Sequence, residues 1–498
     1  MRIFSSLLLT LLLAASPAEG AAIAFDLRGD RLSVDAKNAS VLEILTLFAA
    51  MGVDARLDPA FDVKITAAFK DKDLAKALDH LFDDVNYSAR WEKIEGPLGD
   101  LHRLSEIHVY RPGHRNQAQA IGSELRGDAH EAGENSSAGY LKREILLRLK
   151  PGVSLEDARR LLRELGGQVA GSIPALGIYR IRLSEDQDIP ALAEKLAGDA
   201  RVAAAEPNYT IPIPESTYDA TSLLPVADEA SETEAPPNGA IPVAVLDSGL
   251  LSMPGLDALV LAAYDVTSMS TNMTDPVGHG TQMALIAAGV ILPMGVAASG
   301  AQGVPIVAIR AFGDDGTTSN FDLIRSVNIA VENGARVMNM SWYSTAESDF
   351  LEDVIAYAKA EDVIMVAAAG NDPIGQPVYP AGFDGVIAVA AGNPDGSIWA
   401  QSNYGSFIAL TAPGTAEMPI GYEGDPGLYA GTSIASAYTA GILARYLTQH
   451  PEATGEEALN ALLGALTTDS GTLSVDKHGD GLLDTDAVNR LLGLESAP

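Results

Sequence analysis

Four polar residues in the C-terminal half of the chain have the types and spacing that nucleophilic catalysis needs. Asp247 follows the apolar segment IPVAVL, His279 opens the helical segment HGTQMALIAAG, and Ser433 lies in GTSIAS at the start of another helical segment. A serine becomes a nucleophile when a neutral imidazole accepts its proton, and a buried carboxylate can fix the tautomer of that imidazole. Asn371 ends the apolar segment VIMVAAAGN, and its amide could donate to a developing oxyanion. These residue types together predict acyl transfer at a serine.

Each of the four residues also has an ordinary structural explanation. A strand-terminal aspartate is common, a histidine or serine at a helix start can act as a cap, and asparagine is a frequent turn residue. Ser436 is the nearest rival to Ser433 as a nucleophile. The chain has eight histidines, but only His279 lies between residues 240 and 447, so a serine there has one candidate base. The prediction therefore depends on the four residues occurring together.

The segment from about residue 240 to residue 447 alternates apolar strands with helices. Nearly continuous apolar runs indicate strands buried on both faces, and hence a parallel sheet with helices on either side. Ligands bind such sheets beyond the carboxyl ends of the strands, where Asp247 and Asn371 are expected to lie. The predicted strands are IPVAVL (241–246), VPIVAIRAF (304–312), ARVMNMSW (335–342), VIMVAAA (363–369), VIAVAA (386–391) and FIALTA (407–412).

The short sequences around the four residues are distinctive, and they follow one another in the order Asp, His, Asn, Ser. They are AVLDSG, GHGTQMA, AAAGN, the pair SNYG and APG, and GTSIAS. These segments resemble the subtilisin family of serine peptidases. The resemblance implies that Asp247, His279 and Ser433 form the catalytic triad, and that Asn371 stabilises the oxyanion. It implies a subtilisin-like serine endopeptidase that hydrolyses protein or peptide substrates through an acyl-enzyme and requires no cofactor for catalysis. The residues implied to form the walls of the primary specificity pocket are Ser341, Trp342, Ala368, Ala369 and Gly370.

Two places depart from the pattern of that family. Ala437 and Tyr438 stand where the family usually has proline and histidine, a change that lies a turn away from the nucleophile. Tyr343 stands where a glycine usually follows the equivalent of Ser341-Trp342. We therefore expect Tyr343 to contact the substrate and its bulky ring to narrow the cleft.

The C-terminal segment DKHGDGLLDTDAV (476–488) is similar at first sight to a calcium-binding loop. Its twelfth position, where a bidentate glutamate is needed, is Ala487. We expect the segment to form a turn and the final helix instead. Structural calcium is compatible with the family, but the sequence offers no ligand set, so we predict no metal-binding residue.

Two small α+β domains are predicted before the α/β parallel-sheet catalytic domain. In the first, the strand segments FDLRGDRLSVDA (25–36) and VKITAAFK (63–70) are each followed by an amphipathic helix. This order resembles the short N-terminal domain of secretins and TonB-dependent receptors, which implies docking to an envelope protein; a plain spacer is weighed equally. The second has the order βαββαβ, ends in AEPNYT, and resembles the inhibitory propeptide domain of subtilases. The predicted parts are a signal peptide (1–20), the secretin/TonB-like domain (24–112), a linker (113–142), the propeptide-like domain (143–212), a second linker (213–239) and the peptidase domain (240–495).

Composition and the N-terminal residues limit the compartment and the partners. Residues 1–20 place Arg2 before an apolar run and then small residues, a pattern typical of a secretory signal. No later stretch offers about 18 uninterrupted apolar residues, so we expect no membrane span and a secreted protein, periplasmic or extracellular. The absence of cysteine excludes disulfides and thiolate chemistry. The net charge of -33 argues against a nucleic-acid partner.

Two other functions remain open from the sequence. A catalytically decayed protease domain could serve only to display the N-terminal docking module, but all four site residues are kept, which counts against decay. A lipase-like hydrolase is disfavoured because Ser433 is not surrounded by a Gly-x-Ser-x-Gly elbow.

Overall fold

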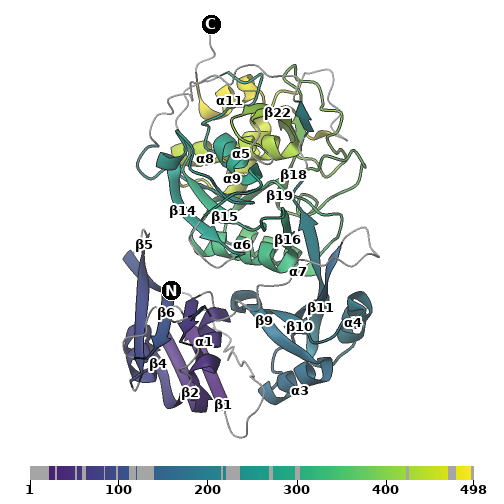
Figure 1. Cartoon of the computed structure of the whole chain (residues 1–498). Coiled ribbons are helices and arrows are strands. Elements are labelled where there is room, and N and C mark those ends of the chain that lie inside the picture. Colours follow the sequence, from purple (N-terminus) through teal and green to yellow (C-terminus); the bar gives the residue numbers. More distant parts are fainter. Residues whose placement is uncertain are drawn as a thin grey trace. The chain divides into compact units, whose positions relative to one another are not determined.

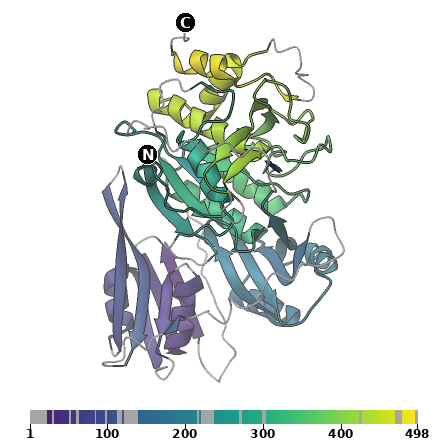
Figure 2. The ribbon, with the colours of Figure 1, turned by 45° about the horizontal axis from the view of Figure 1, so that its top comes forward.

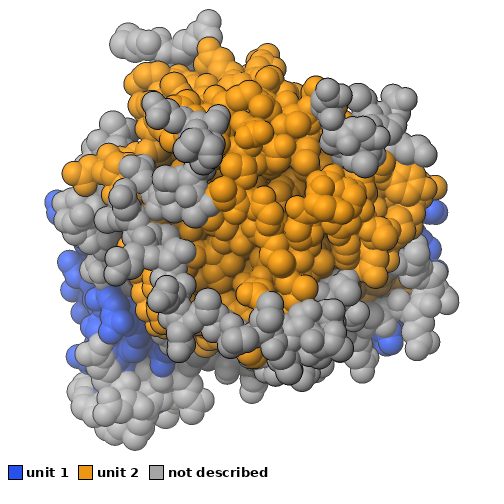
Figure 3. All heavy atoms as spheres, turned by 90° about the horizontal axis from the view of Figure 1, so that it is seen from above, with its two compact units in different colours: residues 1–132, 141–208 blue, residues 133–140, 209–498 orange. Residues whose placement is uncertain are grey.

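The computed structural model describes residues 22–28, 31–50, 53–58, 63–83, 85–96, 99–111, 119–120, 139–214, 217–219, 236–267, 273–297, 303–421, 426–468 and 478–494. The chain divides into two compact units, which Figure 3 colours separately: residues 1–132 with 141–208, and residues 133–140 with 209–498. The predicted signal peptide (1–20) lies outside the described residues.

The N-terminal part of the first unit packs two helices on short sheets. Helix α1 (Val41–Ala50) begins at a capping box, because Ser40 Oγ accepts a hydrogen bond from Glu43 N at 2.9 Å and the Glu43 carboxylate accepts one from Ser40 N at 2.6 Å. Helix α2 (Leu74–Leu81) follows β4, and both helices contribute to one buried apolar cluster. The sheets have the orders β1-β2-β4 and β5-β6-β3-β7. The strands are β1 (Ala22–Arg28), β2 (Arg31–Ser40), β3 (Asp54–Leu57), β4 (Lys64–Asp73), β5 (Asn86–Gly96), β6 (Gly99–Tyr110) and β7 (Gln119–Ala120).

The second part of this unit has the predicted order βαββαβ (Figure 1). Helix α3 (Leu155–Leu165) is capped by Ser154 and ends at Gly166, whose φ of +62° favours glycine. Helix α4 (Ile189–Ala197) is capped by Asp188. Strand β10 pairs antiparallel with β8 and β9, and β11 lies beside β8. The strands are β8 (Tyr140–Leu149), β9 (Gly167–Ile173), β10 (Ile178–Leu183) and β11 (Val202–Pro212).

The second unit is built on a parallel sheet of seven strands in the order β14-β15-β13-β17-β18-β19-β20. All five residues of β13, β15 and β18 are buried, as the apolar runs predict. The α/β parallel-sheet fold class is therefore confirmed, with one more strand, β14, than the six expected. The strands are β13 (Val243–Asp247), β14 (Val260–Asp265), β15 (Ile306–Arg310), β17 (Val337–Met340), β18 (Ile364–Ala368), β19 (Val386–Gly392) and β20 (Leu410–Pro413).

Helices cover both faces of this sheet (Figures 1 and 2). Helices α5 (His279–Ala287) and α8 (Thr432–Gln449) pack against each other on one face, and α6 (Asn320–Glu332) and α7 (Asp349–Ala360) pack together on the other. Every residue of α5 is buried, as are residues 432–444 and Leu447 of α8, so these two helices form the interior of the unit. The final helix α11 (Thr485–Leu492) begins at Asp484, as predicted for the C-terminal segment.

Short antiparallel pairs extend this unit beyond the main sheet. Residues 210–212, at the end of β11, pair with β16 (Thr317–Ser319). Strand β12 (Thr217–Asp219) pairs with β22 (Gly427–Ala430), which also pairs with β21 (Thr415–Met418). Strand β22 ends three residues before Ser433, and both pairs lie within the second unit.

Candidate active site

Asp247 and His279 meet at the carboxyl end of the central strand β13. Asp247 is the last residue of β13 and His279 the first of α5, and both side chains are buried. His279 Nδ1 lies 2.7 Å from Asp247 Oδ1, which also accepts a hydrogen bond from Ser248 N at 2.7 Å. Gly278, at φ +87°, makes the left-handed turn that starts the helix at His279. A carboxylate bound to Nδ1 leaves Nε2 as the ring atom that can accept a proton.

Ser433 is the second residue of α8, and α8 packs directly against α5, which carries His279. Its hydroxyl donates to the backbone oxygen of Ser341 at 3.1 Å, at the end of β17. Ser436, the rival nucleophile, is buried a turn further along, with its Oγ 3.0 Å from both Ser433 O and Ser341 Oγ. The hydroxyl of Ser436 is thus engaged in the interior.

Asn371 is held by the start of α8. Its side-chain Oδ1 accepts hydrogen bonds from Thr432 N at 3.0 Å and from Thr432 Oγ1 at 2.8 Å. Because the amide oxygen faces Thr432, the Nδ2 amino group faces the other way. The backbone of Asn371 also donates to the Tyr343 hydroxyl at 3.2 Å.

Asp275 is a buried carboxylate four residues before His279 that the sequence analysis did not predict as a site residue. Its Oδ1 accepts hydrogen bonds from Ser248 Oγ at 2.7 Å and Gly278 N at 2.9 Å. Its Oδ2 accepts from Thr281 N at 2.7 Å and Thr281 Oγ1 at 2.6 Å. Ser248 Oγ in turn accepts from the backbone of the residue after His279, Gly280 N, at 2.8 Å. Asp275 therefore ties the end of β13 to the first turn of α5, on either side of the Asp247–His279 contact.

The predicted pocket-wall residues lie at the ends of two neighbouring strands, β17 and β18. Their side chains differ in what they offer a substrate. Ser341 Oγ is taken up by Asn339 Nδ2 at 2.8 Å and by the first turn of α8, and Trp342 is fully buried, so these two residues can present only backbone. Ala368 and Ala369 are also fully buried. Of the remaining two, the Tyr343 ring lies beside Gly370, on the side where a side chain of residue 370 would start.

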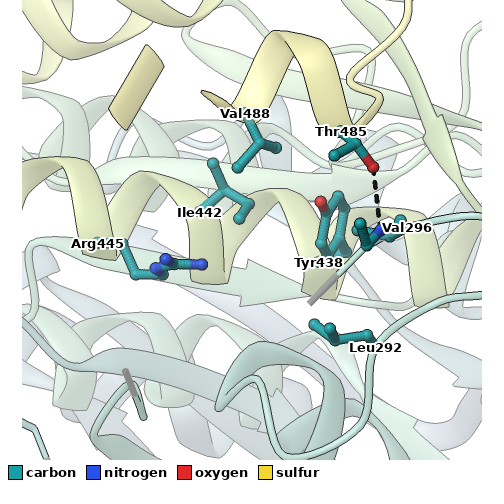
Figure 4. A pocket seen from close by; sticks show the side chains of 8 residues that line it. Leu292, Val296, Tyr438, Ile442, Arg445, Thr485 and Val488 are labelled. Carbon is teal, nitrogen blue, oxygen red and sulfur yellow. Dashed lines mark hydrogen bonds between the residues drawn. The ribbon is translucent and has the colours of Figure 1, made fainter. Parts of the chain in front are cut away.

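Tyr438, one of the two residues that depart from the pattern of the family, packs away from the candidate active site. Tyr438 lines a small pocket with Ile442 and Arg445 of α8 and Val488 of α11 (Figure 4). Burial raises the pKa of the Tyr438 phenol, which keeps it neutral. Tyr438 therefore packs against the C-terminal helix α11 and not beside His279.

Within the described ranges, no group of three or more histidine or acidic side chains is gathered in a way that could hold a metal ion. The same residues include no helix long and apolar enough to cross a membrane.

The comparisons agree with the fold. The model of the Subtilase family matches residues 238–483, and that of the Fervidolysin N-terminal prodomain matches residues 127–208. The chain is 29% identical over 340 residues to the "Thermophilic serine proteinase" of Bacillus sp. strain AK1, covering 64% of this chain and 80% of that protein. It is 30% identical over 291 residues to the "Thermostable alkaline protease" of Halalkalibacterium halodurans, covering 58% of this chain and 78% of that protein.

The fold is also similar to that of a solved structure, fervidolysin from Fervidobacterium pennivorans, described as a keratinolytic enzyme related to subtilisin. The TM-score is 0.59 at 22% sequence identity, over 74% of this chain and 63% of that chain.

A seven-stranded parallel α/β sheet, a carboxylate–imidazole pair at its carboxyl edge and a serine at a helix start define a serine peptidase. An N-terminal prodomain marks it as a zymogen. The chain belongs to the subtilase family and is a subtilisin-like serine endopeptidase. The predicted resemblance to subtilases and to their propeptide is confirmed; the likeness of residues 24–112 to the secretin and TonB domain stays a prediction.

Proposed function

We propose that Ser433 is the nucleophile of this endopeptidase, His279 the general base, Asp247 the residue that orients His279, and Asn371 an oxyanion donor. The observation that supports it best is the buried 2.7 Å contact between Asp247 and His279 Nδ1, which leaves Nε2 as the proton acceptor. Asn371 Oδ1 accepts from Thr432, the residue before Ser433, so the amide is fixed at the start of α8, where its Nδ2 would donate to the negative charge that develops beside Ser433.

The reaction is acyl transfer in two halves. His279 Nε2 takes the proton of Ser433 as Oγ attacks the peptide carbonyl, and Asn371 Nδ2 and Ser433 N–H bind the oxyanion. Collapse breaks the C–N bond, and His279 gives its proton to the departing amine. A water molecule then attacks the acyl-enzyme with His279 as base, and the carboxyl product leaves Ser433 protonated again.

Covalent labelling with a fluorophosphonate tests this assignment. Wild-type enzyme should be labelled at Ser433 and should hydrolyse peptides, and Ser433→Ala should do neither. Ser436→Ala is the matched control, since Ser436 is buried a turn away on the same helix. Labelling that persists in Ser433→Ala, or that is lost in Ser436→Ala alone, would overturn the assignment. A decayed binding protein would not be labelled in any form.

We further propose that the precursor cuts itself between Pro214 and Thr217. On the amino side, Ile213 N donates to Gly316 O at 2.8 Å, and Thr318 of the same β16 segment donates to Ala311 O, next to Asp247. On the carboxyl side, Thr217 pairs with Ala430, three residues before Ser433.

The chain from Pro214 to Thr217 can span at most about 11 Å, so the proposed cut falls between two described strands, one paired close to Asp247 and the other close to Ser433. Glu215 and Ser216 themselves lie outside the described residues.

Self-cleavage is tested by expressing Ser433→Ala and wild type in a host without other secreted proteases. Wild type should lose its prodomain and show a new N-terminus at residue 215, 216 or 217. The mutant should accumulate as a folded precursor, because the remaining oxyanion donors give only slow catalysis. The same cut at the same rate in the mutant would mean that a separate protease activates the precursor.

The predicted division of the chain, with a propeptide-like domain at 143–212 and a peptidase domain at 240–495, is part of this proposal. So is export to the periplasm or the medium; one relative is named "Minor extracellular protease Epr". For residues 24–112 we propose docking to an envelope protein, on the likeness described above. Calcium, which the family would allow, is assigned no residue.

A further inference from the structure

Tyr343 occupies an unusual place next to the oxyanion residue. It follows the buried pair Ser341-Trp342 at the carboxyl end of β17, and it is the first residue after that strand whose side chain is not fully buried. Ser433 Oγ is hydrogen-bonded to the backbone of Ser341 two residues earlier. The Tyr343 ring therefore starts from the same chain segment that borders the nucleophile.

The ring is held at its far end and along its face. Its hydroxyl accepts a hydrogen bond from Asn371 N at 3.2 Å and donates one to Asp372 Oδ2 at 3.2 Å. A Cβ on Gly370 would lie 3.5 Å from Tyr343 Cε2 and 3.6 Å from Cδ2, so the ring lies beside Gly370 on the side where a side chain would start. Burial raises the pKa of the phenol to about 12, so the hydroxyl keeps the proton that it donates to Asp372.

These contacts span the space beside the reacting carbonyl. In the proposed mechanism that carbonyl lies between Ser433 Oγ and Asn371 Nδ2, so it is bordered by the Ser341–Tyr343 segment and by the Gly370–Asn371 segment. The side chain of the substrate residue that supplies the carbonyl is two bonds away and must enter between the same two segments. The ring of Tyr343 already bridges them, from its own backbone to Asn371 N and across the face of Gly370.

We propose that Tyr343 is the specificity-determining residue of this peptidase, and that its ring fills the pocket for the residue on the amino side of the scissile bond. The inference rests on the proposed roles of Ser433 and Asn371. Peptides with glycine, alanine or serine at that position are then the preferred substrates. A phenylalanine or leucine there must displace a ring that is anchored by two hydrogen bonds and by contact with Gly370. We expect such peptides to be cleaved about 10- to 100-fold less efficiently, which is the range of discrimination that pocket size usually gives.

The test compares wild type, Tyr343→Gly and Tyr343→Phe on peptides that differ only at this position, with alanine, leucine or phenylalanine. Wild type should prefer alanine by about 10-fold or more in kcat/KM. Tyr343→Gly opens the pocket and should raise kcat/KM for the phenylalanine peptide by at least about 10-fold, reversing the preference. Tyr343→Phe keeps the ring, loses only the hydroxyl contacts, and should keep a preference for alanine.

Fluorophosphonate labelling of each variant shows whether its site is folded and active. If wild type is labelled but cleaves phenylalanine and alanine peptides equally well, the inference about Tyr343 is wrong and the proposed function stands. The same conclusion follows if Tyr343→Gly is labelled normally yet keeps the wild-type preference. Failure of wild type to be labelled or to cleave any peptide would instead refute the proposed function.

Discussion

Changing Asp275 to asparagine should impair catalysis although Asp275 touches no proposed substrate-binding residue. Its carboxylate joins the residue after Asp247 to the residues on both sides of His279, through Ser248, Gly278 and Thr281. Asparagine has the same shape but replaces one of the two acceptor oxygens with an amino group. The prediction is that Asp275→Asn loosens the position of His279 relative to Asp247.

The size of the effect follows from the four hydrogen bonds. Each oxygen of Asp275 accepts one bond from a hydroxyl and one from a backbone N–H. A hydroxyl can rotate to face an amino group, but a backbone N–H cannot, so either Gly278 N or Thr281 N loses its acceptor in either orientation of the amide. A buried unsatisfied donor costs about 1–3 kcal/mol of folding stability. A displacement of His279 by about 1 Å would lower the rate about 100-fold.

We therefore expect kcat to fall about 10- to 100-fold with KM little changed, since the loss lies in positioning and not in binding. Stability is measured by denaturant unfolding in the Ser433→Ala background, which prevents self-digestion. Asp265→Asn is the control. This buried carboxylate accepts from Thr267 N and Oγ1 through Oδ1 and lies 3.7 Å from Arg310 through Oδ2, and it stands at the end of β14, two strands from β13.

Asp265→Asn should lose stability, because its amino group would face Arg310, and should keep kcat. The reasoning is refuted if Asp275→Asn retains kcat within about twofold of wild type while its stability falls as in the control. It is also refuted if Asp265→Asn lowers kcat as strongly as Asp275→Asn does.

Three further outcomes are expected. Asn371→Ala should lower kcat by about 10²–10³, the loss known for the corresponding donor in subtilisin itself. Thr432→Val removes one of the two hydrogen bonds to Asn371 Oδ1 and should lower kcat about 10-fold. Equal losses in the two variants would contradict the proposed role of Asn371. Burial raises the pKa of Tyr343 to about 12, so this phenol ionises in the unfolded chain before it does in the folded enzyme, and the free energy of unfolding should fall as pH rises from about 10 to 12. Tyr343→Phe should lessen that fall in unfolding experiments. An unchanged fall would count against the buried phenol. Deletion of residues 24–112 from the precursor should leave both self-cleavage and the kcat of the resulting mature enzyme unchanged, because the proposed cut removes this region. A lower kcat would show that the region is needed for the peptidase domain to reach its active form.

The main sheet could be predicted from sequence because its strands are buried on both faces. Residues 243–247 and 364–368 are apolar throughout or end in one polar residue, a pattern that a surface strand does not show. Strand β14 was missed for the same physical reason. It lies at the edge of the sheet, and only its last residue, Asp265, is fully buried, so it has no continuous apolar run.

The site could be predicted where a strand end or a helix start delivers the side chain. Asp247 and His279 were predicted in this way, and they lie 2.7 Å apart. Asp275 was not predicted; the signal that could have marked it is its position three residues before Gly278, where an aspartate can accept a hydrogen bond from the backbone of a turn. The orientation of the pocket-wall side chains could not be predicted from the sequence pattern. Ser341 and Trp342 lie at a strand end, but whether their side chains face the interior or the substrate depends on packing against α8.

The pairing of β12 with β22 also bears on the timing of activation. Hydrolysis between Pro214 and Thr217 would divide the chain without breaking the backbone ladder that joins residues 217–219 to residues 428–430. The new amino end would therefore remain beside Ser433 as a bound product. A ladder of three residue pairs is short, so it should open by local fraying, at a rate independent of the chemical step. Activity should then appear with a delay after the cut itself, and mild denaturant should shorten that delay.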